Sequence, residues 1–119
     1  MRKEIQRTRI GALLDDWEEG LLNESGVHQK AEALWEDCGG QVYPENDSRS
    51  IVVEILSQLE ILNHQWITRE DIPAIRAFLS TPPGEELTGW MVWRQYWKRI
   101  DWETRRAKLQ DNPYYSARS

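Results

Sequence analysis

Near the amino terminus, apolar residues recur at spacings of three and four, the pattern of an amphipathic helix. The pattern predicts a helix over residues 4–23. Its apolar side holds Ile10, Leu13, Leu14, Trp17 and Leu21. Its opposite side holds the acidic residues Asp15, Asp16 and Glu19.

A second helix is predicted to begin at Ser25, a residue type that caps helix amino ends, and to end at Gly39-Gly40. Its apolar face holds Val27, Ala31, Leu34 and Trp35. Its polar face holds Gln29, Glu32 and Glu36. The chain then crosses a turn-rich connection, residues 41–50, which contains Tyr43-Pro44.

A third helix is predicted over residues 49–63, and it is apolar on nearly every side. Its broad stripe consists of Ile51, Val52, Ile55, Leu56, Leu59 and Leu62. A helix of this kind is buried in globular proteins, so the sequence places it at the centre of the fold.

Three further helices are predicted in the second half of the chain. The fourth begins at Thr68, where Asp71 completes a capping box, and presents Ile72, Ile75, Phe78 and Leu79 to the core. The fifth covers residues 85–99 and places one side inward, formed by Trp90, Trp93, Trp97 and Ile100. Asp101 caps the sixth, which continues to about Gln110, and residues 113–119 are predicted to be a loose tail.

These elements predict an all-α fold, a single compact bundle of five to six helices that forms one domain over residues 1–119. All the breaks are short, and no repeat or linker divides the chain. Seven tryptophans supply large buried areas, so few aliphatic residues are needed to complete the core.

Two features of composition bear on location. The single cysteine, Cys38, cannot form an internal disulfide, which favours a reducing compartment. The sequence contains neither a signal-peptide pattern nor an apolar run long enough to span a bilayer. We therefore expect a cytoplasmic protein without a membrane partner.

Charge is strongly segregated along the chain, although the net charge is only −5. Residues 11–60 hold twelve acidic residues against Lys30 and Arg49, which gives −10. Residues 1–10 carry +3 and residues 61–119 carry +2. Such a distribution affects which partners the protein binds and how fast it associates with them, and it favours a cationic partner.

Few residues could support catalysis or bind a metal. Cys38 is the only thiol and lies at a predicted helix carboxyl end, which raises a thiol pKa. His28 and Glu32 are spaced as two metal ligands, but neither His64 nor any other residue completes a set of three or four. The sequence therefore favours a binding protein over an enzyme, and predicts no metal and no cofactor.

The segment of about residues 30–56 resembles the immunity proteins of nuclease colicins. The resemblance lies in an acidic helix, a glycine-containing turn, Tyr43-Pro44, the step Asp47-Ser48 and a helix that opens with Ile51-Val52. It implies that an acidic second helix and the tyrosine beside the proline contact a basic nuclease and inhibit it. The residues to which this role would transfer are Glu32, Glu36, Asp37, Tyr43 and Asp47.

The sequence analysis thus favours an inhibitor of a basic toxin, with Tyr43 as the aromatic anchor and acids of the first two helices around it. Two alternatives stay open. The tryptophan-rich carboxyl half could be an oligomer interface of a structural or regulatory subunit. Basic and aromatic residues interleave over residues 94–108, a pattern that can also serve nucleic acid.

Overall fold

The computed structural model describes residues 6–39 and 41–116, and within these ranges the chain is helical with no strand. The elements are α1 (Arg7–Glu18), α2 (Glu24–Asp37), α3 (Arg49–Leu59), α4 (Leu62–Gln65), the 3-10 turn η1 (Arg69–Asp71), α5 (Ile72–Leu79), α6 (Glu86–Lys98), α7 (Trp102–Leu109) and α8 (Pro113–Ser116). The all-α prediction is confirmed. The predicted number of helices is wrong, since one expected helix is divided and another forms near the carboxyl end.

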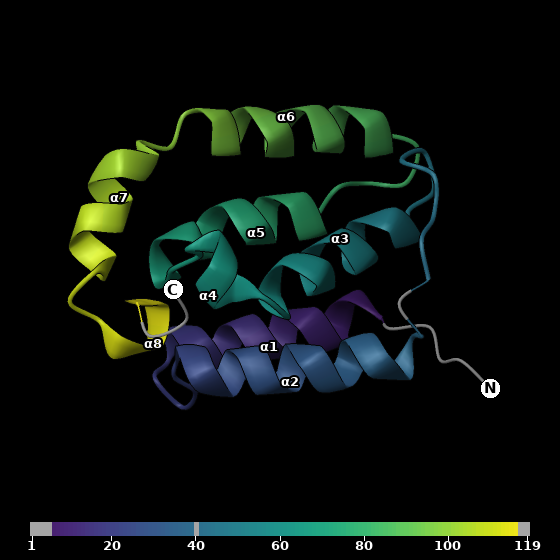
Figure 1. Ribbon diagram of the computed structural model, residues 1–119. Coiled ribbons are helices and arrows are strands. Elements are labelled where there is room, and N and C mark those ends of the chain that lie inside the picture. Colours follow the sequence, from purple (N-terminus) through teal and green to yellow (C-terminus); the bar gives the residue numbers. More distant parts are fainter. Residues whose placement is uncertain (1–5, 40, 117–119) are drawn as a thin grey trace.

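The helices lie in three tiers (Figure 1). The pair α1 and α2, which run in opposite directions, forms one tier, and α3 and α5 form the middle one. Helix α6 lies on the far side of α5, and α7 and α8 descend along one end toward α2. Helix α3 packs mainly against α2 and α5, as its broad apolar stripe predicted. This arrangement places α2 and α6 on opposite sides of the molecule.

Helix α1 ends earlier than its apolar pattern predicted. Gly20, with φ of +83°, adopts the left-handed conformation that commonly terminates helices, and the chain turns away. Leu21, expected on the apolar side of the helix, is consequently 72% exposed. The cap of α2 also differs from the prediction, because Asn23 rather than Ser25 accepts the hydrogen bond from the Gly26 N–H, at 2.8 Å.

The predicted third helix is interrupted at Ile61, whose φ of −130° and ψ of +35° are not helical. A single turn, α4, follows and ends at Trp66 in the left-handed conformation. This bend allows the core to receive both Leu62 and Ile67, which are almost completely buried. The continuous helix over residues 49–63 is therefore wrong, although every residue of its predicted stripe is buried.

The capping box predicted at the start of the fourth helix is confirmed. Thr68 Oγ1 accepts a hydrogen bond from the Glu70 N–H, and the Asp71 carboxylate accepts one from the Thr68 N–H. The helix opens as the turn η1 and continues as α5, with Pro73 tolerated in its first turn. Its predicted core face is buried throughout.

The carboxyl end is more ordered than the sequence predicted. Asp101 caps α7 as expected, accepting from the Thr104 N–H at 3.1 Å. Instead of a loose tail, residues 113–116 form α8, and the ring of Tyr115 is buried with its hydroxyl donating to the Ile67 carbonyl at 2.5 Å. Residues 117–119 lie outside the described part. None of the described helices has the combination of length and apolar character that crossing a bilayer requires.

Candidate partner-binding surface

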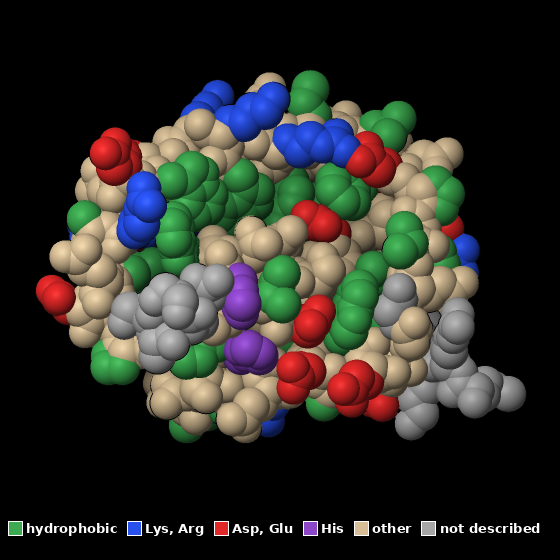
Figure 2. Space-filling view, in the orientation of Figure 1, with side chains coloured by type: hydrophobic (Ala, Val, Ile, Leu, Met, Phe, Trp, Pro, Cys, Tyr) green, Lys and Arg blue, Asp and Glu red, His purple; other side chains and the backbone are tan. Residues whose placement is uncertain are grey.

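The carboxyl half of α2 carries three predicted site residues, Glu32, Glu36 and Asp37, and all three are exposed. Glu32 lies 3.8 Å from the His28 ring, one turn earlier. No described basic side chain forms an ion pair with Glu36 or Asp37. The space-filling view shows acidic side chains gathered over this end of α2, whereas basic ones lie along α6 and α7 (Figure 2).

The position of these acids in the helix is unfavourable. A helix carboxyl end carries partial negative charge, so acids there are destabilising by about 0.3–1 kcal/mol each at exposed sites. Glu36 and Asp37 occupy the last turn of α2, and that turn contains no basic residue. Neither the helix nor an ion pair within the described residues accounts for them.

The structure separates the acids of α1 from those of α2. Because the two helices are antiparallel, the carboxyl end of α1 lies beside the amino end of α2 (Figure 1). Asp15 pairs with Arg76 of α5 at 2.8 Å, together with Glu18 at 3.0 Å, and these contacts raise the pKa of Arg76. Glu19 is exposed and Asp16 is half-buried. Asp15, Asp16 and Glu19 therefore do not share a patch with Glu36 and Asp37.

Tyr43 and Asp47, the two predicted residues of the connecting loop, are both organised by Arg49. The Arg49 guanidinium lies 4.3 Å from the centroid of the Tyr43 ring, a cation–π contact. Asp47 accepts from Arg49 Nη2 at 2.7 Å, from Nε at 3.0 Å and from the backbone N–H at 2.9 Å. These hydrogen bonds, chiefly those of the side chain, lower the pKa of Asp47 to about 2.

The loop between α2 and α3 also contacts α6, because Glu45 forms an ion pair with Arg94. Arg94 in turn packs over the Trp90 ring at 5.1 Å. The loop between α2 and α3 thus has defined contacts at Tyr43 and, after it, at Glu45 and Asp47. A preorganised loop loses less conformational entropy on binding than a free one.

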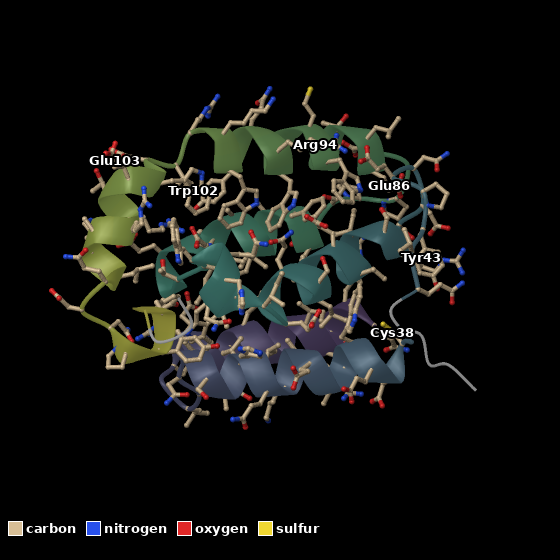
Figure 3. All side chains as sticks on the ribbon, in the orientation of Figure 1. Cys38, Tyr43, Glu86, Arg94, Trp102 and Glu103 are labelled. Carbon is tan, nitrogen blue, oxygen red and sulfur yellow. The ribbon has the colours of Figure 1, made fainter. Side chains whose placement is uncertain are left out.

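Val42 is a member of this surface that the sequence analysis missed. It is 81% exposed, the most exposed of the large apolar side chains in the described residues, and it precedes the half-buried Tyr43. An apolar residue inside a polar, turn-rich loop was the available signal. Tyr43 and Cys38 lie at the same end of the molecule, where α2 gives way to the loop (Figure 3). We define the α2–loop surface as Glu32, Glu36, Asp37, Val42, Tyr43 and Asp47.

The residues considered for catalysis do not meet. Cys38 is buried and its thiol donates to the Trp35 carbonyl at 3.2 Å. His28 lies at the other end of α2, ten residues or about 15 Å away along the helix, and its Nδ1 contacts the Tyr114 hydroxyl at 2.5 Å. In the described part of the chain, no group of three or more His, Cys, Asp or Glu residues is arranged to hold a metal ion.

Half of the basic residues in the basic–aromatic segment of residues 94–108, namely Arg94, Arg105 and Arg106, are engaged within the fold. Arg105 is buried and donates to both carboxylate oxygens of Asp71, at 2.7 and 2.9 Å. Tyr96 donates to the same carboxylate at 2.5 Å, and burial, followed by this contact, raises the pKa of Tyr96 to about 12. Arg106 packs over the Trp66 ring at 5.4 Å. No local sequence pattern signals this buried pair of Asp71 and Arg105, because its members are 34 positions apart.

The tryptophans of α6 also face inward. Trp93 is buried and stacks on Phe78 of α5 with ring centroids 4.5 Å apart, and its Nε1 donates to Glu54 of α3 at 3.0 Å. Trp90 and Trp97 are half-buried beside it. The exposed apolar residues of α6 are Leu87, Met91 and Val92 instead.

Comparison with known proteins adds no assignment: no family model, curated protein or solved structure matches the chain.

Proposed function

We propose that this chain is a protein-binding inhibitor, most plausibly a bacterial immunity protein that neutralises a basic toxin through the α2–loop surface. The observation that carries the proposal is the pair Glu36 and Asp37, which remain exposed and without a described cation at a helix end that disfavours them. A cationic partner would supply the missing charge. The resemblance of residues 30–56 to colicin immunity proteins supports the same surface.

The loop provides the apolar part of such an interface. Aromatic residues at the centre of an interface commonly dominate its binding energy, and a polar rim excludes water around them. Tyr43 and Val42 suit the central position, and the acids of α2 suit the rim. Arg49 and Asp47 hold the Tyr43 ring in place. In this proposal Asp47 orients the anchor, and Asp15 serves the fold by bridging α1 to α5.

The proposal is tested by binding to purified basic nuclease domains, including any toxin-like protein encoded beside this chain. Charge reversal with E36K and D37K together should weaken binding by at least about tenfold, and Tyr43→Ala should weaken it by a similar factor. The control is Glu19→Lys, which makes half that charge change, +2 instead of +4, at the carboxyl end of α1. A loss for Glu19→Lys of half or more of the loss in binding free energy for E36K/D37K would show a diffuse electrostatic effect. Absence of binding to every domain tested would contradict the proposal.

A further inference from the structure

Helix α6 exposes an apolar face that the fold leaves uncovered. Five large apolar side chains of the described residues are notably exposed, and three of them belong to this one helix. They are Leu87, Met91 and Val92, with exposed fractions of 62%, 51% and 54%. In Figure 2, separate hydrophobic side chains project at the α6 edge of the molecule among the basic ones. Grouping of this kind marks interaction sites, whereas single exposed apolar residues are ordinary.

A groove runs beside this face, between α5 and α6. It has a volume of 330 Å³ and is lined by Ala77, Phe78, Thr88 and Val92, among others. The α5–α6 connection packs so closely on α6 that there is no room for a side chain at Gly89, where a Cβ would lie 2.4 Å from Thr81 Oγ1. Val92 belongs both to the lining of the groove and to the exposed apolar residues of α6.

The two residues that cap α6, Glu85 at its amino end and Arg99 at its carboxyl end, are charged and lie at equal distances along the chain from Val92. Glu85 precedes it by seven residues and Arg99 follows it by seven. Seven residues are nearly two helical turns, so the three side chains lie along one stripe with about 10 Å between successive members. From the amino to the carboxyl end, the stripe consists of the acidic Glu85, the apolar Val92 and the basic Arg99. Within the described residues, neither Glu85 nor Arg99 makes an ion pair or a side-chain hydrogen bond.

A stripe with this order is complementary to its own copy. A twofold axis that passes by Val92 and is perpendicular to α6 sets two α6 helices antiparallel. It then brings Glu85 of each copy to Arg99 of the other, with Val92 and Met91 of both copies at the centre. A foreign helix would need to match this pattern independently, whereas a second copy carries the match already.

We propose that α6 is the interface of a symmetric, antiparallel homodimer centred on Val92. The interface uses the aliphatic face of α6, and the tryptophans behind it remain in the core. The exposed acids of α2 lie on the opposite side of the molecule from α6 (Figure 1), whereas the loop reaches α6 through the Glu45–Arg94 ion pair. The dimer proposal does not rest on the proposed inhibitor function, and its test measures mass rather than binding to a toxin.

The proposal is tested by sedimentation equilibrium of the full chain between about 5 and 500 μM, where a dimer of moderate affinity changes its mass with concentration. The wild-type chain should approach twice the monomer mass of 14.1 kDa. Val92→Lys places two like charges at the twofold axis and should raise the dimer Kd at least about tenfold. Val42→Lys, the same substitution on the loop, should leave the Kd unchanged. A wild-type chain that stays monomeric, or a Val92→Lys chain that dimerises normally, would overturn the proposal.

The antiparallel register of the two α6 helices is tested separately, by exchanging the charges of Glu85 and Arg99. Glu85→Arg and Arg99→Glu should each weaken the dimer, and each does so twice, since the contact occurs on both sides of the axis. The double variant E85R/R99E restores opposite charges and should return the Kd to within about twofold of wild type, as a double-mutant cycle requires. Circular dichroism and urea unfolding of each variant separate a lost interface from a lost fold. Failure of the double variant to recover, with the fold intact, would overturn the antiparallel register.

Discussion

At the scale of single residues, Asp47 shows how a short local contact can organise a loop. Its carboxylate binds both the side chain and the backbone N–H of Arg49, whose guanidinium also covers the Tyr43 ring. The sequence predicted Asp47 and Tyr43 as members of one site. Their organisation by Arg49 was not predicted, although a two-residue spacing between Asp47 and Arg49 is well suited to such a contact.

The pH dependence of Asp47 follows from this contact. Its folded pKa of about 2 lies below the ordinary value of 3.8, so the ionised group contributes stability above the ordinary value. That contribution is lost as the pH falls from the ordinary pKa through the folded one. We expect Arg49→Met to raise the Asp47 pKa toward 3.8, measured by NMR titration of the carboxyl carbon. Arg94→Met, which removes the partner of Glu45, should leave it near 2; a low pKa retained in Arg49→Met would contradict the assignment.

The buried pair of Asp71 and Arg105 is the residue-scale feature with the largest expected effect on stability. Removing one member of a buried ion pair leaves the other uncompensated, which costs about 3–5 kcal/mol. Arg105→Met should lower the free energy of unfolding by this amount, measured by urea denaturation. Arg106→Met, on the exposed side of the same helix, should change it by less than about 1 kcal/mol. Asp71→Asn combined with Arg105→Met should cost less than Arg105→Met alone, because no charge is then left buried.

The same pair marks the limit of prediction from local sequence. Asp71 was predicted as part of a capping box from its spacing to Thr68, and that contact is present. Its second role, as the acceptor of Arg105 and Tyr96, depends on the packing of α6 and α7 against η1. No periodicity in the sequence encodes such a contact, because its members are far apart along the chain.

At the scale of elements, the apolar pattern predicted which faces are buried better than where helices end. The stripes of α2, α3 and α5 are buried as expected, except that Trp35 of α2 is half-buried, since burial follows directly from periodicity. The ends depended on single backbone conformations, the left-handed Gly20 and the non-helical Ile61. Helix α8 was missed because its order comes from the tertiary hydrogen bond and burial of Tyr115, not from helix propensity.

Helix α2 permits a test of whether its terminal acids reduce stability. Replacing Glu36 and Asp37 by lysine removes negative charge from the last turn and adds positive charge, each change being favourable to the helix dipole. We expect E36K/D37K to raise the free energy of unfolding by about 0.5–2 kcal/mol in low salt. Gln29→Lys, at an exposed position in the middle of α2, should have little effect. If E36K/D37K is no more stable than wild type, the argument that these acids are unfavourable in the free protein fails.

At the scale of the whole molecule, the segregation of charge along the chain becomes a segregation in space. Acidic side chains gather over the carboxyl half of α2, and basic ones lie along α6 and α7 on the opposite side (Figure 2). The sequence predicted the acidic half but placed the acids of α1 and α2 in one field. The antiparallel arrangement of the two helices divides them, and Arg76 neutralises part of the α1 group.

This spatial separation makes a prediction about association rates. If the α2–loop surface attracts a basic partner, long-range attraction should accelerate encounter, and salt should screen it with a Debye length of about 10 Å at 0.1 M. The association rate constant with a basic nuclease domain should therefore fall at least about tenfold between 0.02 and 0.5 M salt, measured by stopped-flow fluorescence. The dissociation rate should change much less, because it depends on the close contacts of Tyr43 and Val42. E36K/D37K should flatten the salt dependence, whereas Glu19→Lys should flatten it by less than half as much, since it changes half as much charge and lies at the carboxyl end of α1. An association rate indifferent to salt would exclude steering by this surface and leave only its apolar contacts to explain binding.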